Sequence, residues 1–270
     1  MFRFFLQTDF IFRSQEYTWS HLLEEEGMNV QGNAKSTSSH NGRYRIMKTN
    51  QAECVLLLDE ILVDTYKDLD QNSELVSAAI SDDGLIAISL RTDVSGIVRI
   101  YKDDFQSFVQ NDVWEAGYGT GLSLTPSGSK IAIGSPEENL VYTYDLEPEG
   151  VIKRDSRMSI FGPNESGGFG SKVGLSEKGT SIAIATPNAE MEDIAVGAIY
   201  VYVLIDGGWE PLTSVLYGSS NILNLGIGGV SLDDSRGIVT AQDSTLGQKH
   251  TFLVSIGLCL FTSCAPKLGP

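Results

Sequence analysis

The sequence predicts an all-β fold, a β-propeller built from four-stranded antiparallel blades. Two observations carry this prediction: a turn that recurs between two short apolar runs, and a third run rich in β-branched and aromatic residues. In the clearest copy, residues 169–175 lead through a turn at 176–179 into residues 182–185, and residues 198–202 follow. Alternating β-branched and aromatic residues between glycine-, asparagine- and proline-rich turns are the signal of strands and hairpins.

The recurrence of this pattern indicates that the blade is the repeating unit. Residues 118–136 align with residues 169–187 without a gap, including the Ile-Ala-Ile run and the proline that follows it. Weaker copies of the turn occur at residues 82–84, 232–235 and 38–42. A unit of about 42–56 residues with four short strands is typical of a propeller blade.

The chain order predicts one propeller domain over residues 1–270. We expect a partial blade at 1–29, a degenerate blade at 30–74, clear blades at 75–117, 118–168 and 169–224, and a partial blade at 225–270. Pairing the N-terminal strands with the C-terminal ones in a composite blade would close the ring and remove exposed sheet edges, which gives five blades. Six blades result if the two ends form separate blades, and an open arc of a larger ring is a further alternative.

Each unit also ends in a characteristic way. Third strands are expected at residues 97–101, 141–144, 199–202 and 61–66. Trp114 and Trp209, each followed by glutamate, fall where a fourth strand belongs. We expect these indoles to anchor the packing of blades, with an exposed platform for a carbohydrate or peptide as the alternative.

These residues resemble the FG-GAP-type propeller repeat, which is named for its Phe-Gly and Gly-Ala-Pro signatures and is best known from the head of the integrin α-subunit. The resemblance rests on Phe169-Gly170, the Leu-Ser-x-x-Gly turn, Ile-Ala-Ile-Ala-x-Pro and Gly-Ala-Ile-Tyr-Val-Tyr, and it covers residues 30–250. The Gly-Ala-Pro element survives only as Gly-Ser-Pro at 134–136 and Ala-Thr-Pro at 185–187. The resemblance implies a propeller with a binding role, in cell adhesion or a similar extracellular or cell-surface setting.

Composition narrows the class of partner. The 270 residues carry a formal net charge of −16 and a pI near 4.5, which argues against nucleic acid, since phosphates need a basic surface. The apolar run at 252–261 is too short to span a membrane. Gln7 and Asp9 interrupt the apolar start of the chain, so no signal peptide is evident and the compartment stays open.

Cysteine usage does not decide the compartment either. Cys54 lies in an apolar run and is expected to be a buried small hydrophobe. Cys259 and Cys264 are close enough in sequence for a disulfide, although spacing alone does not show one.

A calcium loop is the one metal site that the sequence suggests. Asp68, Asp70 and Asn72 have the spacing of the first three ligands in an Asp-x-Asp-x-Asp-Gly loop, where alternate residues direct oxygens to one side. Ser73 replaces the glycine and Ala79 the final glutamate, so a solvated turn between blades is the simpler expectation. A second acidic loop at 188–193 lacks ligand spacing.

No catalytic motif is evident. His21, His40 and His250 are scattered, no Gly-x-Ser-x-Gly elbow is present, and no cofactor is indicated. We expect a non-enzymatic binding or scaffold module that presents propeller loops to a protein or glycan partner. The alternatives are a glycoside-active propeller with two axial carboxylates about 5–10 Å apart, and a degenerate fragment with no retained activity.

Overall fold

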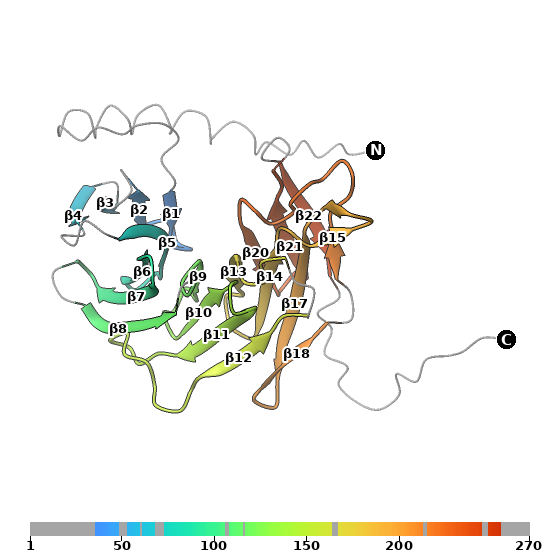
Figure 1. The fold of residues 1–270 in the computed structure, drawn as a ribbon. Helices are drawn as coiled ribbons and strands as arrows, with labels where there is room; N and C mark the ends of the chain where they lie inside the picture. Colours follow the sequence, from blue (N-terminus) through green and yellow to red (C-terminus); the bar gives the residue numbers. More distant parts are fainter. Residues whose placement is uncertain are drawn as a thin grey trace, which may run out of the picture.

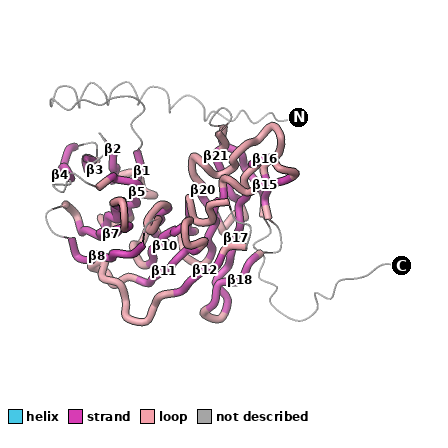
Figure 2. The backbone as a smooth tube through the Cα atoms, viewed as in Figure 1, coloured by secondary structure: helices cyan, strands magenta, loops and turns pink. Residues whose placement is uncertain are grey.

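The computed structural model describes residues 36–48, 53–59, 61–67, 73–105, 108–115, 117–163, 167–212, 215–244 and 248–254. Within these residues every regular element is a strand and none is a helix, as the tube of Figure 2 shows. Five antiparallel sheets follow one another along the chain and fan around a common centre (Figure 1). The predicted all-β propeller is confirmed, with five blades in the part of the chain that the structure describes.

Each sheet is a meander of consecutive strands, and a small separate hairpin interrupts the fourth. Blade 1 contains β1 (Ser36–Ser38), β2 (Tyr44–Lys48), β3 (Glu53–Leu58) and β4 (Ile61–Lys67). Blade 2 contains β5 (Glu74–Ile80), β6 (Leu85–Arg91), β7 (Ser95–Lys102) and β8 (Phe108–Glu115). Blade 3 contains β9 (Gly121–Leu124), β10 (Lys130–Ser135), β11 (Leu140–Asp145) and β12 (Met158–Phe161).

Blade 4 contains β13 (Lys172–Leu175), β14 (Ser181–Thr186), β17 (Ala198–Ile205) and β18 (Gly208–Pro211), with β19 (Leu216–Tyr217) also paired to β17. The separate hairpin, β15 (Glu190–Met191) and β16 (Ile194–Ala195), lies between β14 and β17. Blade 5 contains β20 (Val230–Asp233), β21 (Ile238–Gln242) and β22 (Lys249–Leu253) within the described residues. In Figure 1 the first strand of each blade lies towards the centre of the fan and the last towards its periphery.

One strand assignment from the sequence is wrong. Residues 61–66 were expected to form a third strand, but β4 is the outer, fourth strand of blade 1, and β3 is the third. The sequence of β3 is apolar at nearly every position, so both of its faces can be covered, and Leu56 is fully buried there. The equally apolar start of β4 lies at the edge of the sheet, where Ile61 is 70% exposed.

The core fills the seams between blades. The second strands β6, β10 and β14 are buried along nearly their whole length, because neighbouring blades cover both faces of each strand. Phe169 shows how a seam is filled: it is fully buried in a cluster that joins Val141 and Ile160 of blade 3 to Ile182 and Ile184 of blade 4. The blades are therefore held together mainly by apolar surface between sheets.

The aromatic-glycine pair of the repeat begins each well-formed inner segment. The ring of Phe169 meets the rings of Tyr200 and Tyr202 edge-on, with centroids 5.7 and 6.3 Å apart. Gly170 follows with φ +90°, a left-handed backbone that glycine adopts without strain. Its N–H donates to the carbonyl of Ala185 at 3.1 Å, so the pair sets the register of the inner strand against β14.

Candidate functional site

The inner strands of all five blades line a central channel. Two adjoining cavities, of about 540 and 730 Å³, occupy its two ends. Their shared walls come from β1, β5, β9, β13 and β20, and are formed by small or apolar residues: Thr37, Ala78, Leu122, Val173 and Val230. One cavity reaches Lys172 and Gln242, and the other reaches the turns that follow the inner strands, so the two mouths of the channel open on opposite faces of the ring.

We call the two faces of the ring the lower face and the upper face, and each is defined by the connections that it carries. The lower face carries the turns that follow the inner strands, at residues 39–43, 81–84, 125–129, 176–180 and 234–237. The upper face carries the described connections between second and third strands, at residues 92–94, 136–139 and 187–197 and at 243–244 and 248, and the described parts of the connections that enter blades 3, 4 and 5. Polar groups gather at the mouths: Lys172 and Gln242 at the upper one, and His40, Glu177 and Arg236 at the lower one.

The lower turns of the first four blades share one hydrogen-bonding pattern. The residue that ends each of the first four inner segments is a buried hydroxyl: Ser39, Ser81, Thr125 or Ser176. In the best copies, the backbone N–H of Lys130 donates to the Thr125 hydroxyl at 3.1 Å and that of Ser181 to the Ser176 hydroxyl at 3.1 Å. Glycine at a positive φ completes the turn, as at Gly179 with φ +66°. Geometry alone therefore explains why this motif repeats.

The lower turns are also linked from blade to blade. The backbone N–H of Asn41 donates to the Asp82 carboxylate at 2.7 Å, and the N–H of Asp82 donates to the carbonyl of Pro126 at 2.8 Å. The Thr180 hydroxyl donates to the Asp234 carboxylate at 3.1 Å. Much of the polar chemistry of this face is thus engaged in holding neighbouring blades together.

Two carboxylates lie at the lower mouth, which bears on the glycosidase alternative. Asp233 accepts hydrogen bonds from the Ser235 hydroxyl at 2.6 Å and the Arg236 N–H at 3.2 Å, and its carboxylate lies 3.6 Å from the Arg236 guanidinium. The Ser235 hydrogen bond, more than any other contact, lowers the pKa of Asp233, so this group is ionised at neutral pH. Among the described lining residues, Glu177 and Asp233 are the only carboxylates; Glu177 lies on a lower turn, and Asp233 is the last residue of β20, at the lower mouth.

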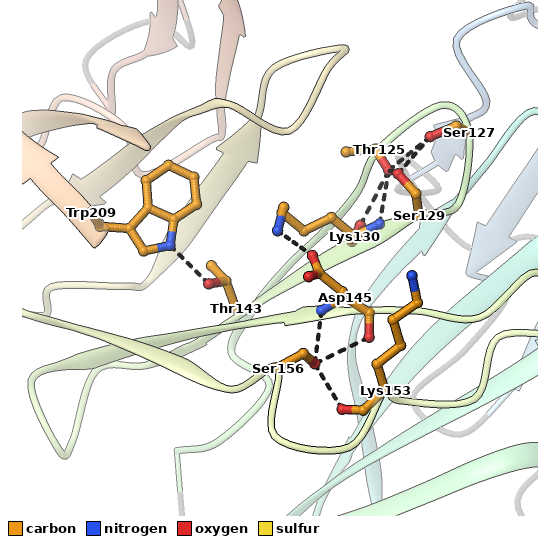
Figure 3. A network of polar contacts seen from close by, with 9 residues as sticks. All are labelled: Thr125, Ser127, Ser129, Lys130, Thr143, Asp145, Lys153, Ser156 and Trp209. Carbon is orange, nitrogen blue, oxygen red and sulfur yellow. Dashed lines mark hydrogen bonds and ion pairs between the residues drawn. The ribbon is translucent and has the colours of Figure 1, made fainter. Parts of the chain in front are cut away.

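Trp209 lies at the seam between blades 3 and 4, as the packing role predicts. Figure 3 shows its indole N–H directed at the hydroxyl of Thr143, to which it donates at 2.9 Å. Thr143 is fully buried on β11, and Trp209 packs against the apolar cluster of the same seam. Nearby, Lys130 forms an ion pair with Asp145 of the paired strand (Figure 3). Trp114 lies on β8, a fourth strand, as expected.

The remaining candidate residues have mixed outcomes. Asp68, Asp70 and Asn72 lie outside the described residues, so the calcium loop stays a prediction, and Cys259, Cys264 and His21 lie outside them as well. His40 occupies a lower turn and Cys54 is fully buried on β3, as expected. Within the described ranges, no three His, Cys, Asp or Glu side chains are grouped as a metal site, and no helix could span a membrane.

The feature that sequence reasoning missed is the hairpin β15–β16. Residues 188–193 were read as an acidic loop, yet they form half of an ordered ribbon in which Met191 pairs with Ile194. Glu192 and Asp193 make its two-residue turn with φ of +51° and +63°. The signal was available: two apolar residues flank two turn residues, although Glu-Asp is not the Asn-Gly or Asp-Gly pair that usually marks such a turn.

Comparison with known proteins shows a shared fold. No protein-family model matches the sequence, and no curated protein matches it. Among solved structures, the chain resembles hydrazine synthase from Kuenenia stuttgartiensis with a TM-score of 0.57 and 13% identity, covering 82% of this chain and 71% of that one. It resembles the β-propeller domain of Cps50 (Swd1) from Myceliophteria thermophila with a TM-score of 0.53 and 12% identity, covering 84% and 86%.

A third solved structure, Hsv2 from Kluyvelomyces marxianus, gives a TM-score of 0.54 and 11% identity over 81% of this chain and 59% of that one. Identities this low show the fold alone. The kinship with FG-GAP repeats is therefore a prediction that rests on the motifs of this sequence. By fold, the chain is a five-bladed β-propeller similar to known propeller domains.

Proposed function

We propose that this chain is a non-enzymatic scaffold that binds a protein partner through its upper face. The observation that carries this proposal is the contrast between the turns that follow the inner strands and the connections between the second and third strands. Lower turns are uniform and hydrogen-bonded to their neighbours. Upper connections between the second and third strands vary from three residues in blade 2 (92–94) to eleven in blade 4 (187–197). Similar turns that hold the blades together at one mouth of the channel, with connections of variable length around the other mouth, are a usual arrangement of a binding scaffold.

The channel supports this assignment over an enzyme. The inner strands contribute mainly small and apolar side chains to its described wall, and its two carboxylates lie at the lower mouth, Glu177 on a turn and Asp233 at the end of β20. Asp233, one of the two, is held by Ser235 and Arg236 as part of its turn. A glycan partner is the alternative binding class, and the FG-GAP resemblance would place either partner outside the cell or at its surface.

Site-specific photo-crosslinking tests the proposal. A photoreactive amino acid is placed on the upper face at Val94 or Ile194, and on the lower face at Val151 or Ile205. Ile194, Val151 and Ile205 are 43%, 42% and 41% exposed, so the two faces are compared at matched accessibility. In an extract of the source cells we expect discrete protein adducts from the upper positions only.

Other outcomes point elsewhere. Equal adducts from both faces, or none from either, would contradict the proposal. Specific retention on immobilised oligosaccharides without protein adducts would favour a glycan partner. Release of sugar from a panel of aryl glycosides, lost on Glu177→Gln, would favour the enzyme.

A further inference from the structure

The hairpin β15–β16 is a rigid projection from the upper face. Met191 pairs with Ile194 and Glu190 with Ala195. The two turn residues both have positive φ, the geometry of a type I′ turn, whose twist matches that of paired strands. The described part of the ring has no second insertion of this kind between a second and a third strand.

Hydrogen bonds and burial anchor the base of this hairpin. The N–H of Gly197 donates to the Ala189 carbonyl at 2.9 Å, which closes the ribbon. The N–H groups of Asn224 and Leu225 donate to the carbonyls of Ala195 and Val196 at 3.1 and 2.9 Å. Ala189 and Val196 are 5% and 3% exposed, so the ribbon is fixed to the entry of blade 5 and its tip is held in place.

Apolar side chains are exposed at the tip and on the segments bonded to the base. Met191 and Ile194 face each other across the ribbon and are 44% and 43% exposed. Tyr217 and Ile227, at 42% and 44%, lie on either side of the segment that bonds to the base, where the Gly218 N–H donates to the Gly197 carbonyl at 2.9 Å. We call Met191, Ile194, Tyr217 and Ile227 the hairpin patch. Exposed apolar groups with an adaptable methionine are typical of protein-binding surfaces.

The charges on the hairpin itself are all acidic, and Lys172 lies at the channel mouth that Ile227 also lines. Glu190, Glu192 and Asp193 are exposed, and no lysine or arginine among the described residues forms an ion pair with them. The Lys/Arg–carboxylate pairs found in the described ranges all lie on the lower face: Arg43–Asp59, Lys102–Asp83, Lys130–Asp145, Arg154–Asp155 and Arg236–Asp233. The carboxylates of the hairpin thus lack an internal counter-charge.

We propose that the hairpin patch docks a protein segment in which apolar side chains are flanked by lysine or arginine. The apolar residues of the segment cover Met191 and Ile194, and its cations meet Glu190, Glu192 and Asp193. Opposite charges across an interface raise the association rate and set the register of docking. This inference rests on the scaffold function proposed above, and it names the chemistry of the partner.

Defined peptides test it by fluorescence anisotropy. The first probe is a labelled peptide of leucines flanked by lysines; its matched controls replace the lysines by glutamate or the leucines by serine. The protein variants are Glu190→Gln/Glu192→Gln/Asp193→Asn and Met191→Ser/Ile194→Ser. A charge-matched control, Glu147→Gln/Glu149→Gln/Asp155→Asn, removes three exposed carboxylates from the lower face. Unchanged thermal unfolding verifies that each variant is folded.

We expect the lysine-leucine peptide to bind the wild type and the lower-face control alike. Each hairpin variant should weaken that binding by about tenfold, because charge and apolar contact both contribute. Equal weakening by the hairpin and lower-face triple variants would mean attraction to net charge alone and would overturn the inference, as would no binding to the wild type. Cross-links from Val94 that persist in the hairpin variants would keep the scaffold function while rejecting this docking site.

Discussion

The carbonyl oxygen of Gly170 lies against the Cα of Gly134, at the seam between blades 3 and 4. A Cβ built on Gly134 would overlap this oxygen and stand 3.2 Å from the Gly170 Cα. The matching position of blade 2 is Ser89, whose hydroxyl donates to the Gly119 carbonyl at 2.6 Å. The second strand of blade 3 thus contacts the aromatic-glycine segment of blade 4 backbone to backbone, because position 134 has no side chain.

Gly134→Ala should therefore destabilise the protein strongly. The obstacle is backbone, which cannot rotate away, so we expect a loss of about 3 kcal/mol in the free energy of unfolding. Gly208→Ala is the matched control, because its nearest neighbour is the Ile205 carbonyl at 3.8 Å, and it should change stability by less than about 0.5 kcal/mol. Urea denaturation measures both, and equal effects would show that the close approach at the seam is not what matters.

Removing the indole N–H of Trp209 should destabilise the protein, because the buried hydroxyl of Thr143 loses its hydrogen-bond donor. Trp209→Phe deprives the buried Thr143 hydroxyl of its hydrogen bond. We expect this to lower the free energy of unfolding by about 1–2 kcal/mol, in addition to the loss from packing a smaller ring. In a double-mutant cycle with Thr143→Val, the double variant should lose less than the sum of the single losses. Strict additivity would mean that this hydrogen bond contributes nothing across the seam.

A partly buried tyrosine, Tyr200, predicts a loss of stability at high pH. Burial, and next the neighbouring Tyr217, raises the pKa of Tyr200 from its ordinary 10.0 to about 12. The unfolded chain loses this proton near pH 10 while the folded chain keeps it, so the stabilisation is complete below pH 10 and is lost as pH rises to about 12. Tyr200→Phe should flatten the decline in unfolding free energy between these values, whereas an unchanged slope would refute the assignment.

The candidate calcium loop predicts a metal-dependent melting temperature. If Asp68, Asp70 and Asn72 bind calcium in the folded chain alone, excess calcium raises Tm and chelator lowers it, by mass action. Asp68→Asn/Asp70→Asn should abolish that response, and Asp82→Asn, on a lower turn, is the control that should retain it. A Tm indifferent to both calcium and chelator would leave these residues a solvated turn.

The sequence repeats made the fold predictable, whereas features that occur in one blade alone could not be predicted from them. The turn at residues 176–179 and the Phe169-Gly170 pair have counterparts in other blades, so alignment within the chain was enough to assign them. The hairpin at 190–195 has no counterpart and could not be found in this way. The assignment of residues 61–66 was wrong because apolar character does not distinguish a third strand from an outer one. How the two ends of the chain pair stays a prediction.

Contacts between blades could not be predicted from the sequence, for a different reason. Trp209 and Thr143 meet only because two sheets stack in a particular register, and a shift by one residue would turn each side chain to the other face. The lower-face link from Asp82 to Pro126 likewise depends on how two turns approach one another. No local pattern encodes either distance.

The chain of bonds along the lower turns has a consequence for how the ring opens. The amide hydrogens of Asn41 and Asp82 lie in surface turns, yet each is held by the neighbouring blade. The Asp82 N–H donates to a backbone carbonyl of blade 3, so its exchange with solvent reports the loosening of the seam between blades 2 and 3 rather than the fraying of a turn. Foreign sequences grafted between Thr186 and Ala198, on the upper face, would leave the hydrogen bonds of the lower turns in place. Amide exchange at those turns would then measure whether a grafted loop loosens the ring.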